Sequence, residues 1–167
     1  LARRRGLQLS VHVADDAPQT MFTDRQRLEQ ILRNLLANAV KFTDRGSVSL
    51  RIAPDEGGRV RFEVRDSGIG IAPSQQDLTF EAFRQADGTS SRKYGGTGLG
   101  LSISRDLARL LGGDISVDSA PGQGSTFVVS LPGEYHAALA QEPMAMAPPT
   151  SVPTPTPAQP RSLPAPS

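Results

Sequence analysis

Two stretches of alternating apolar and polar residues, separated by one tight turn, constrain the fold more than any other feature of the chain. Ser47 to Ala53 carries apolar side chains at every second position, and the same alternation returns from Val60 to Val64. Between them, Asp55-Glu56-Gly57-Gly58 has the composition of a turn. Strands joined by so short a connection pair antiparallel, so the sequence predicts a β-hairpin within a mainly antiparallel sheet.

The remaining elements are predicted on both sides of this hairpin. Alternation predicts further strands at residues 7–13, 115–117 and 125–131, the first of them half-buried. Helical periodicity predicts one helix from Thr23 or Asp24 to about Phe42, and another from Leu99 to Leu111. The irregular stretch from Ser67 to Gly100 is typical of a functional or disordered loop. This order favours an α/β (α+β) two-layer sandwich with helices on one face of the sheet.

Glycine and proline are distributed unequally along the chain. All sixteen glycines lie at or before Gly133, whereas nine of the fourteen prolines follow it. A proline-rich segment with little apolar surface cannot form a packed core. We therefore predict one domain over residues 1–133 and a Pro/Ala-rich flexible tail or linker over residues 134–167.

Charge, cysteine content and hydropathy exclude several classes of protein. Eighteen basic residues oppose seventeen acidic ones, which argues against nucleic acid or an anionic membrane as the main partner. The absence of cysteine excludes disulfides, thiol catalysis and cysteine-based zinc sites. No apolar run approaches the roughly 18 residues that span a bilayer. We expect a soluble chain with no nucleic-acid partner and no membrane contact.

The first predicted helix carries a polar stripe. At 100° per residue, five side chains fall within about 60° of arc: Arg27, Gln30, Asn34, Asn38 and Lys41. A solvated helix face is one interpretation. The other starts from the two asparagines, which are mediocre helix formers and lie one turn apart. Amide oxygens can ligate Mg²⁺ beside phosphates, and a lysine one turn further on suits a phosphate.

Two glycine motifs follow the hairpin. In Asp66-Ser67-Gly68-Ile69-Gly70-Ile71 an acidic residue ends a strand, which indicates either a turn or a carboxylate that accepts a hydrogen bond from a base amine. Gly95-Gly96-Thr97-Gly98-Leu99-Gly100-Leu101 opens the second helix, which indicates either a hinge or a phosphate-binding loop. Arg92 and Lys93 precede it and are positioned to reach phosphates.

In this order the motifs resemble the ATP-binding catalytic domain of sensor histidine kinases, within the group shared with gyrase, the 90-kDa heat-shock chaperones and mismatch-repair ATPases. The similar segments are residues 34–43 (N box), 66–70 (G1 box), 80–83 (F box), 96–100 (G2 box) and 122–127 (the last glycine motif). The resemblance covers residues 7–132, and residues 80–100 look most like those of hybrid kinases.

The resemblance implies a Bergerat-type ATP-binding fold, with three helices on one face of a mixed sheet. Mg²⁺ would bind Asn38, with Asn34 near it as a second metal residue. Lys41 would contact phosphate, and Asp66 would accept from the adenine amine. One lid cation would meet the γ-phosphate, and the resemblance does not choose among Arg84, Arg92 and Lys93. Phe80 and Phe83 would anchor the lid. The remaining nucleotide contacts implied are Phe42, Gly68, Gly70, Ile71, Gly96, Thr97, Gly98, Leu99, Gly100 and Thr126.

The implied function is transfer of the γ-phosphoryl group of Mg²⁺–ATP to a histidine on a separate dimerisation domain, upstream in a longer protein. Neither His12 nor His136 looks like that acceptor. Hydrolysing relatives carry a glutamate where this chain has Asn34, so we expect slow intrinsic hydrolysis. A response-regulator receiver domain is the second expected partner, and the fragment is expected to be monomeric and cytoplasmic. The alternatives are a non-catalytic nucleotide-binding or docking module, and a serine kinase or ATPase of the same fold.

Overall fold

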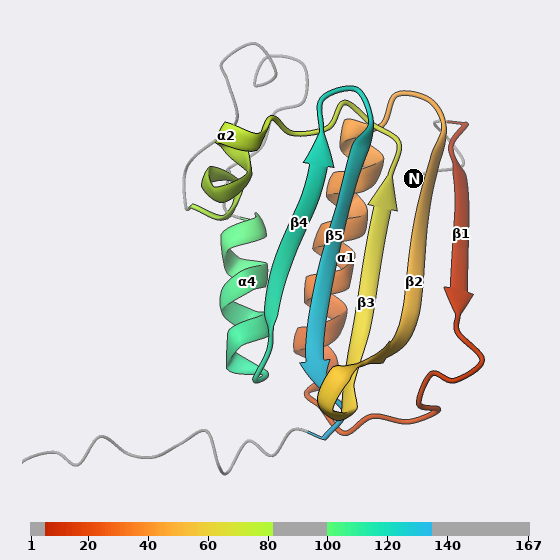
Figure 1. Ribbon diagram of the computed structural model, residues 1–167, viewed down its shortest axis with the longest axis vertical. Helices are drawn as coiled ribbons and strands as arrows, with labels where there is room; N and C mark the ends of the chain where they lie inside the picture. The colour runs from red at the N-terminus through yellow and green to blue at the C-terminus, as the bar shows by residue number, and fades with distance from the viewer. Residues whose placement is uncertain (1–5, 82–99, 135–167) are drawn as a thin grey trace, which may run out of the picture.

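The computed structural model describes residues 6–81 and 100–134, which form one sheet with helices on one of its faces (Figure 1). The strand order is β1-β2-β3-β5-β4. β1 pairs with β2 in parallel, and the other three pairs are antiparallel. The predicted two-layer sandwich with a mixed, mainly antiparallel sheet is therefore confirmed. The strands are β1 (Gln8–Val13), β2 (Ser47–Asp55), β3 (Arg59–Asp66), β4 (Asp114–Ala120) and β5 (Gly124–Pro132).

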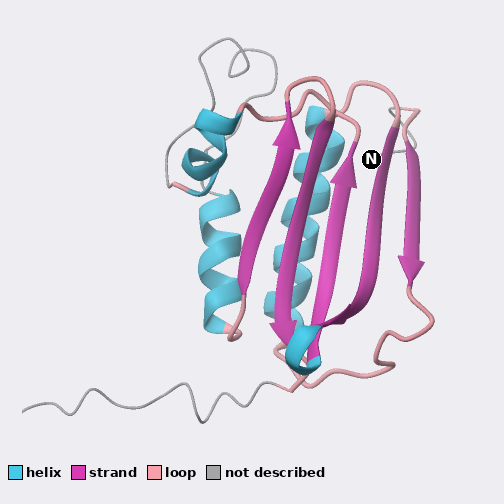
Figure 2. Ribbon diagram, viewed as in Figure 1, coloured by secondary structure: helices cyan, strands magenta, loops and turns pink. Residues whose placement is uncertain are grey.

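Three α-helices lie in the described part of the chain (Figure 2). They are α1 (Arg25–Phe42), α2 (Pro73–Gln76) and α4 (Gly100–Leu110). Two 3₁₀ turns accompany them: η2 (Glu56–Gly58) connects β2 to β3, and η3 (Asp77–Phe80) follows α2. The two long helices confirm those predicted from periodicity, within the described residues. No helix in this part of the chain is long and apolar enough to cross a membrane.

Local chemistry sets both ends of α1. Asp24 is the N-cap, because its Oδ1 accepts from the Arg27 backbone N–H at 3.2 Å. At the other end the backbone of Thr43 is extended, and its buried hydroxyl donates to the Ala39 carbonyl at 2.7 Å. The helix therefore ends at Phe42, immediately beside the sheet.

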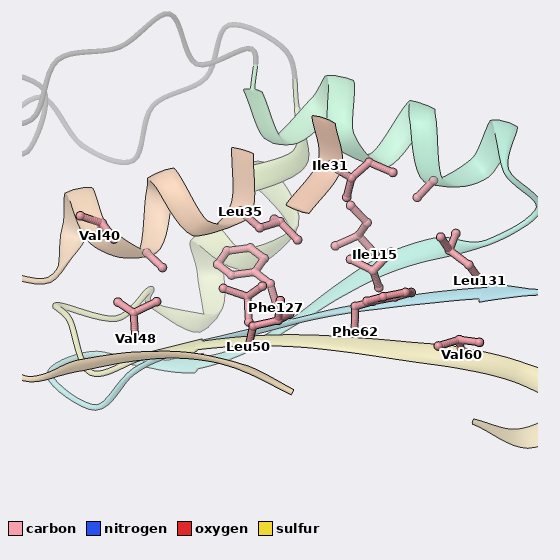
Figure 3. Packing of buried hydrophobic residues seen from close by; sticks show 14 of the residues in the cluster. Ile31, Leu35, Val40, Val48, Leu50, Val60, Phe62, Ile115, Phe127 and Leu131 are labelled. Atoms are coloured by element: carbon pink, nitrogen blue, oxygen red, sulfur yellow. The ribbon is translucent and has the colours of Figure 1, made fainter. Parts of the chain in front are cut away.

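The core lies between the helices and the sheet (Figure 3). β3 alternates as predicted, with Val60, Phe62 and Val64 buried. Ile31 and Leu35 of α1 are fully buried on the opposite side. The core therefore holds α1 over the centre of the sheet.

The structure confirms the strand predicted at residues 7–13 as β1, but this strand is more exposed than predicted. Leu9, Val11 and Val13 are 56–62% exposed, although their side chains alternate as expected. The reason is position: β1 is the outer strand beside β2, whereas α1 packs over β3 and β2 and α4 packs over β4. Alternation reports two faces of a strand, and only tertiary structure decides whether a helix covers one of them.

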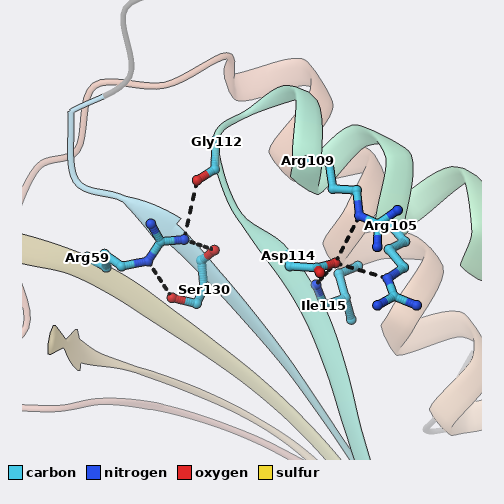
Figure 4. A network of polar contacts seen from close by, with 7 residues as sticks. All are labelled: Arg59, Arg105, Arg109, Gly112, Asp114, Ile115 and Ser130. Atoms are coloured by element: carbon cyan, nitrogen blue, oxygen red, sulfur yellow. Dashed lines mark hydrogen bonds and ion pairs between the residues drawn. The ribbon is translucent and has the colours of Figure 1, made fainter. Parts of the chain in front are cut away.

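Polar contacts connect β3 to β5 and α4 to β4 at the end of the sheet where β3 begins (Figure 4). Arg59 donates to the Ser130 hydroxyl at 2.8 Å and to the Ser130 carbonyl at 2.9 Å. Arg105 and Arg109 of α4 both pair with Asp114, at 3.0 and 3.5 Å. Arg59 begins β3 and Asp66 ends it, so this network stabilises the end of the sheet opposite Asp66.

Candidate nucleotide site

The C-terminal ends of α1 and β3 meet, and this brings together two of the predicted motifs. The Ile69 backbone N–H donates to the Phe42 carbonyl oxygen at 3.2 Å. A Cβ at residue 68 would lie well inside contact distance of the same carbonyl, so only glycine fits there. The turn after β3 therefore lies directly against the last turn of α1, which carries Lys41 and follows Asn38.

Asp66 ends β3 as a buried carboxylate that is 6% exposed. Its Oδ1 accepts from the Gly68 backbone N–H at 2.8 Å. Burial raises the pKa of the Asp66 carboxyl above its ordinary value of 3.8, and the backbone N–H groups of Gly68 and Ser125 oppose that shift. A buried carboxylate held in this way is suited to accept a hydrogen bond from a ligand amine.

The raised pKa of Asp66 predicts how stability depends on pH. The folded protein binds this proton more tightly than the unfolded chain, so the stabilisation is complete below pH 3.8 and is lost as pH rises through the folded-state pKa. Asp66→Asn removes this titration. We therefore expect its free energy of unfolding, relative to the wild type, to increase from acid to neutral pH in urea titrations. A difference that stays constant with pH would contradict the raised pKa.

Two further glycines hold the turn after β3 against the β4–β5 connection. Gly70 has φ +71° and Gly124 has φ +82°, both in the left-handed region. A Cβ on Gly70 would collide with the Ala120 carbonyl oxygen, and one on Gly124 with that of Asp66. The resemblance implied Gly70 as a nucleotide contact, and the structure gives both glycines a further reason, the close approach of backbone segments.

Ser119 and Gln76 complete this corner, and sequence reasoning had not singled out either residue. The Ser119 hydroxyl accepts from the Ile71 backbone N–H at 2.8 Å. The Gln76 side chain donates to the Ser119 carbonyl at 2.6 Å. They fix half-buried Ile71, one of the expected base contacts, at the end of the turn. Ser119 follows the strand predicted at residues 115–117, and Gln76 lies in the irregular stretch from Ser67 to Gly100, so no local pattern marked either residue.

The structure brings Ser125, and not Thr126, to the face of the sheet that carries Asp66. Ser125 is the register partner of Asp66 and is 6% exposed. Thr126 pairs with Arg65 and Asp118, whose side chains point to the opposite face because successive residues of a strand alternate. The sequence contained this signal, since Phe127, Val129 and Leu131 already defined the inward positions.

The two asparagines of α1 lie in different surroundings. The Asn34 amide nitrogen donates to α4, to the Gly100 carbonyl and the Ser104 hydroxyl. The Asn38 side chain is half-buried, and within residues 6–81 and 100–134 it makes no hydrogen bond. Lys41 is half-buried too, with its Nζ 4.9 Å from the centre of the Phe42 ring. Within the described residues, Asn38 is thus the asparagine whose side chain makes no hydrogen bond, whereas Asn34 is held to α4 through its amide nitrogen.

A hard cation would fit this donor set. The described part of the chain contains no group of three or more His, Cys, Asp or Glu that could hold a metal. Mg²⁺ accepts amide oxygens and keeps other positions for phosphate oxygens or water, so it does not need a carboxylate cage. Asn38 fits as a single protein ligand to a cation carried by a phosphate compound.

Phe80 packs at the edge of the core. Its ring meets Phe127 edge-on at 6.3 Å between centroids, and the Arg105 guanidinium lies 4.7 Å above it. The other site residues predicted between positions 80 and 99 lie outside the described residues: Phe83, Arg84, Arg92, Lys93, Gly96, Thr97, Gly98 and Leu99.

Comparison with known proteins supplies independent findings. Residues 23–135 match the family model described as histidine kinase-, DNA gyrase B- and HSP90-like ATPase. The chain is similar to signal transduction histidine-protein kinase BarA of Escherichia coli (strain K12), with 43% identity over 127 residues. It is also similar to hybrid signal transduction histidine kinase B of Dictyostelium discoideum, with 41% identity over 132 residues.

A solved structure agrees with the fold. The crystal structure of full-length ShkA in complex with AMPPNP aligns with a TM-score of 0.70 and 40% identity over 78% of this chain. The matches cover 74% of this chain for BarA and 77% for the Dictyostelium kinase. They cover only 14% of BarA, 7% of the Dictyostelium kinase and 26% of ShkA. The chain thus corresponds to one part of these longer proteins.

Proposed function

Since the chain belongs to the histidine kinase-, DNA gyrase B- and HSP90-like ATPase family, we propose that it binds Mg²⁺–ATP and transfers the γ-phosphoryl group to a histidine on a separate dimerisation domain, in two-component signal transduction. The observation that carries the proposal is the buried Asp66 carboxylate, held by backbone N–H groups beside the end of α1. The similar proteins are histidine kinases, and ShkA was crystallised with an ATP analogue.

Asp66 is the proposed recognition group for adenine. Its ionised carboxylate would accept from the amine of the base, a donor that guanine does not present at that position. Gly68 and Gly70 leave the backbone open to the base, while Ile71 and Phe42 would line it. A charge-assisted hydrogen bond of this kind contributes about 1.5–3 kcal/mol, enough to select one base.

The last turns of α1 are the proposed phosphate side of the site. Asn38 would hold Mg²⁺ through its amide oxygen, and Lys41 would contact a phosphate oxygen. The cation, when bound, neutralises phosphate charge. Backbone N–H groups at Gly96, Thr97, Gly98, Leu99 and Gly100, with a cation from Arg84, Arg92 or Lys93, would orient the γ-phosphoryl group for in-line transfer.

Asn34 favours transfer over hydrolysis. A carboxamide cannot accept a proton from water at neutral pH, so residue 34 cannot act as a general base. The nucleophile must then come from elsewhere, and we propose an imidazole nitrogen of the dimerisation domain. Electrostatic positioning of ATP is the part of the reaction that this chain contributes.

A transfer assay with γ-labelled ATP tests the proposal. The chain is incubated with Mg²⁺–ATP and the histidine-containing domain of a similar kinase, and the acceptor is then treated with acid or alkali. We expect labelled acceptor whose label is lost in acid and kept in alkali, as for phosphohistidine, with little phosphate released when the acceptor is omitted. An acid-stable label would indicate a serine kinase, and rapid phosphate release without acceptor an ATPase. Binding without either product would indicate a docking module.

The wider organisation is part of the same proposal. Residues 1–133 would form the catalytic domain, and residues 134–167 a linker toward a receiver domain, the second partner of a hybrid kinase. We propose that the chain acts in the cytoplasm, as a monomer, with dimerisation supplied by the acceptor domain.

A further inference from the structure

The Asn34 side chain joins α1 to the first turn of α4. Its amide nitrogen donates to the Gly100 carbonyl oxygen and, at 2.7 Å, to the Ser104 hydroxyl. Gly100 and Ser104 are four residues apart, so they lie on the same face of α4, one turn from each other. A single amide group on α1 therefore spans the whole first turn of the neighbouring helix.

The Asn34 amide lies so close to Gly100 that it leaves little room for a side chain there. A Cβ at residue 100 would lie 2.6 Å from the Asn34 Oδ1 and 3.0 Å from its Nδ2. The φ of Gly100 is outside the left-handed region, so the backbone conformation itself does not require glycine. Glycine is also among the weakest helix formers. The close approach of Asn34 favours glycine at the start of α4.

Ser104 shows that the contact is specific. The residue is 1% exposed, and a buried hydroxyl without a hydrogen-bond partner is destabilising. Asn34 is its side-chain partner from α1, from 70 positions earlier in the sequence. The pairing therefore selects one relative position of the two helices rather than merely filling space between them.

We infer that Asn34 is a positioning residue, which holds the first turn of α4 beside α1 and so sets where α4 begins relative to Asn38 and Lys41. The inference rests on the proposed function, in which nucleotide phosphates lie between these elements. The first backbone N–H groups of a helix have no partner within it. A displaced first turn would move those donors away from bound phosphate and weaken binding.

A role as a metal ligand predicts the opposite result for one substitution. A carboxylate is a stronger Mg²⁺ ligand than an amide, so Asn34→Asp would keep or increase the enhancement of binding by Mg²⁺. In the positioning role the same change removes both N–H donors and places a carboxylate against the Gly100 carbonyl oxygen. Nucleotide binding would then weaken with and without Mg²⁺ by the same factor.

Calorimetric titration with AMPPNP, with and without Mg²⁺, separates the two roles. We expect Asn34→Asp to weaken binding roughly tenfold in both conditions and to leave their ratio at the wild-type value. Ser104→Ala, which removes the other partner and leaves α1 unchanged, should weaken binding roughly twofold to threefold. Gln30→Glu makes the same amide-to-carboxylate change one turn earlier, at an exposed position of α1, and should stay within about twofold of the wild type.

Two outcomes would overturn the inference. One is an Asn34→Asp variant that keeps wild-type affinity or shows a larger Mg²⁺ enhancement. The other is a folded Ser104→Ala variant with lower stability but unchanged affinity, since the contact would then be structural only.

A double-mutant cycle with Asn34→Ala, Ser104→Ala and the double variant, measured by unfolding, tests the contact independently of the proposed function. We expect a coupling of roughly twofold to tenfold in the unfolding equilibrium constant without nucleotide. If the wild type bound no nucleotide, the proposed function would fail, and a measured coupling would still establish the Asn34 contact. No coupling would overturn the inference even if nucleotide bound.

Discussion

Replacing Asn38 by alanine is expected to abolish the Mg²⁺-dependent part of nucleotide binding and to reduce phosphotransfer at least about 100-fold. Asn38 is half-buried near the end of α1, and no hydrogen bond engages its side chain within the described residues. No described residue engages the amide oxygen, and alanine offers a cation no replacement ligand. Alanine also exceeds asparagine in helix propensity, by up to about 0.7 kcal/mol, so we expect the variant to fold normally.

Gln30→Ala is the matched control for this experiment. Gln30 lies on the same polar stripe of α1, two turns earlier, and is exposed. The substitution does not touch the proposed site, and it gains less helix propensity than Asn38→Ala because glutamine is already a good helix former. We expect wild-type titrations and transfer rates for the control. Equal losses in both variants, or an Asn38→Ala variant that retains Mg²⁺-enhanced binding, would remove Asn38 from the site.

Replacing Gly70 by alanine should lower the stability of the fold strongly, and more than Gly57→Ala does. Gly70 has φ +71°, and its missing Cβ is what allows the Ala120 carbonyl to approach. A left-handed backbone costs an L-residue about 1–2 kcal/mol, and overpacking costs a further 1–3 kcal/mol or so. We therefore expect a loss of about 2–5 kcal/mol in the free energy of unfolding, measured by urea denaturation.

Gly57→Ala separates the cost of the left-handed backbone from the cost of overpacking. Gly57 has φ +68°, close to the value at Gly70, but nothing lies within 4 Å of a Cβ built on it. It belongs to the η2 turn, at the opposite end of β3 from Asp66. We expect this control to lose only the backbone term, about 1–2 kcal/mol. Losses of equal size in the two variants would show that the approach of Ala120 does not constrain the turn.

Much of the fold could be predicted from the sequence because its signals are local. The α1 helix is marked by an N-cap aspartate and a regular apolar face, and the hairpin by alternation around a glycine-containing turn. Ser125 could have been preferred to Thr126 on the same grounds, since alternation along β5 already assigned inward and outward positions. These features depend on neighbours a few residues away.

Contacts between distant segments could not be predicted in the same way. The Asn34 amide meets Gly100, 66 positions later in the chain, and nothing local to either residue indicates the pair. The exposure of Leu9, Val11 and Val13 depends on the place of β1 at the edge of the sheet, which alternation does not report. The reason for glycine at residue 70 likewise depends on where the β4–β5 connection runs.

Calorimetric titration of the wild-type chain with AMPPNP, in the presence and absence of Mg²⁺, tests the central claim most directly. The proposed site predicts saturable binding of one nucleotide per chain, strengthened by Mg²⁺ and weakened when GMPPNP replaces AMPPNP. The first dependence reports Asn38 and the second reports Asp66. Absence of binding at millimolar analogue, or binding that is indifferent to both the cation and the base, would contradict the account.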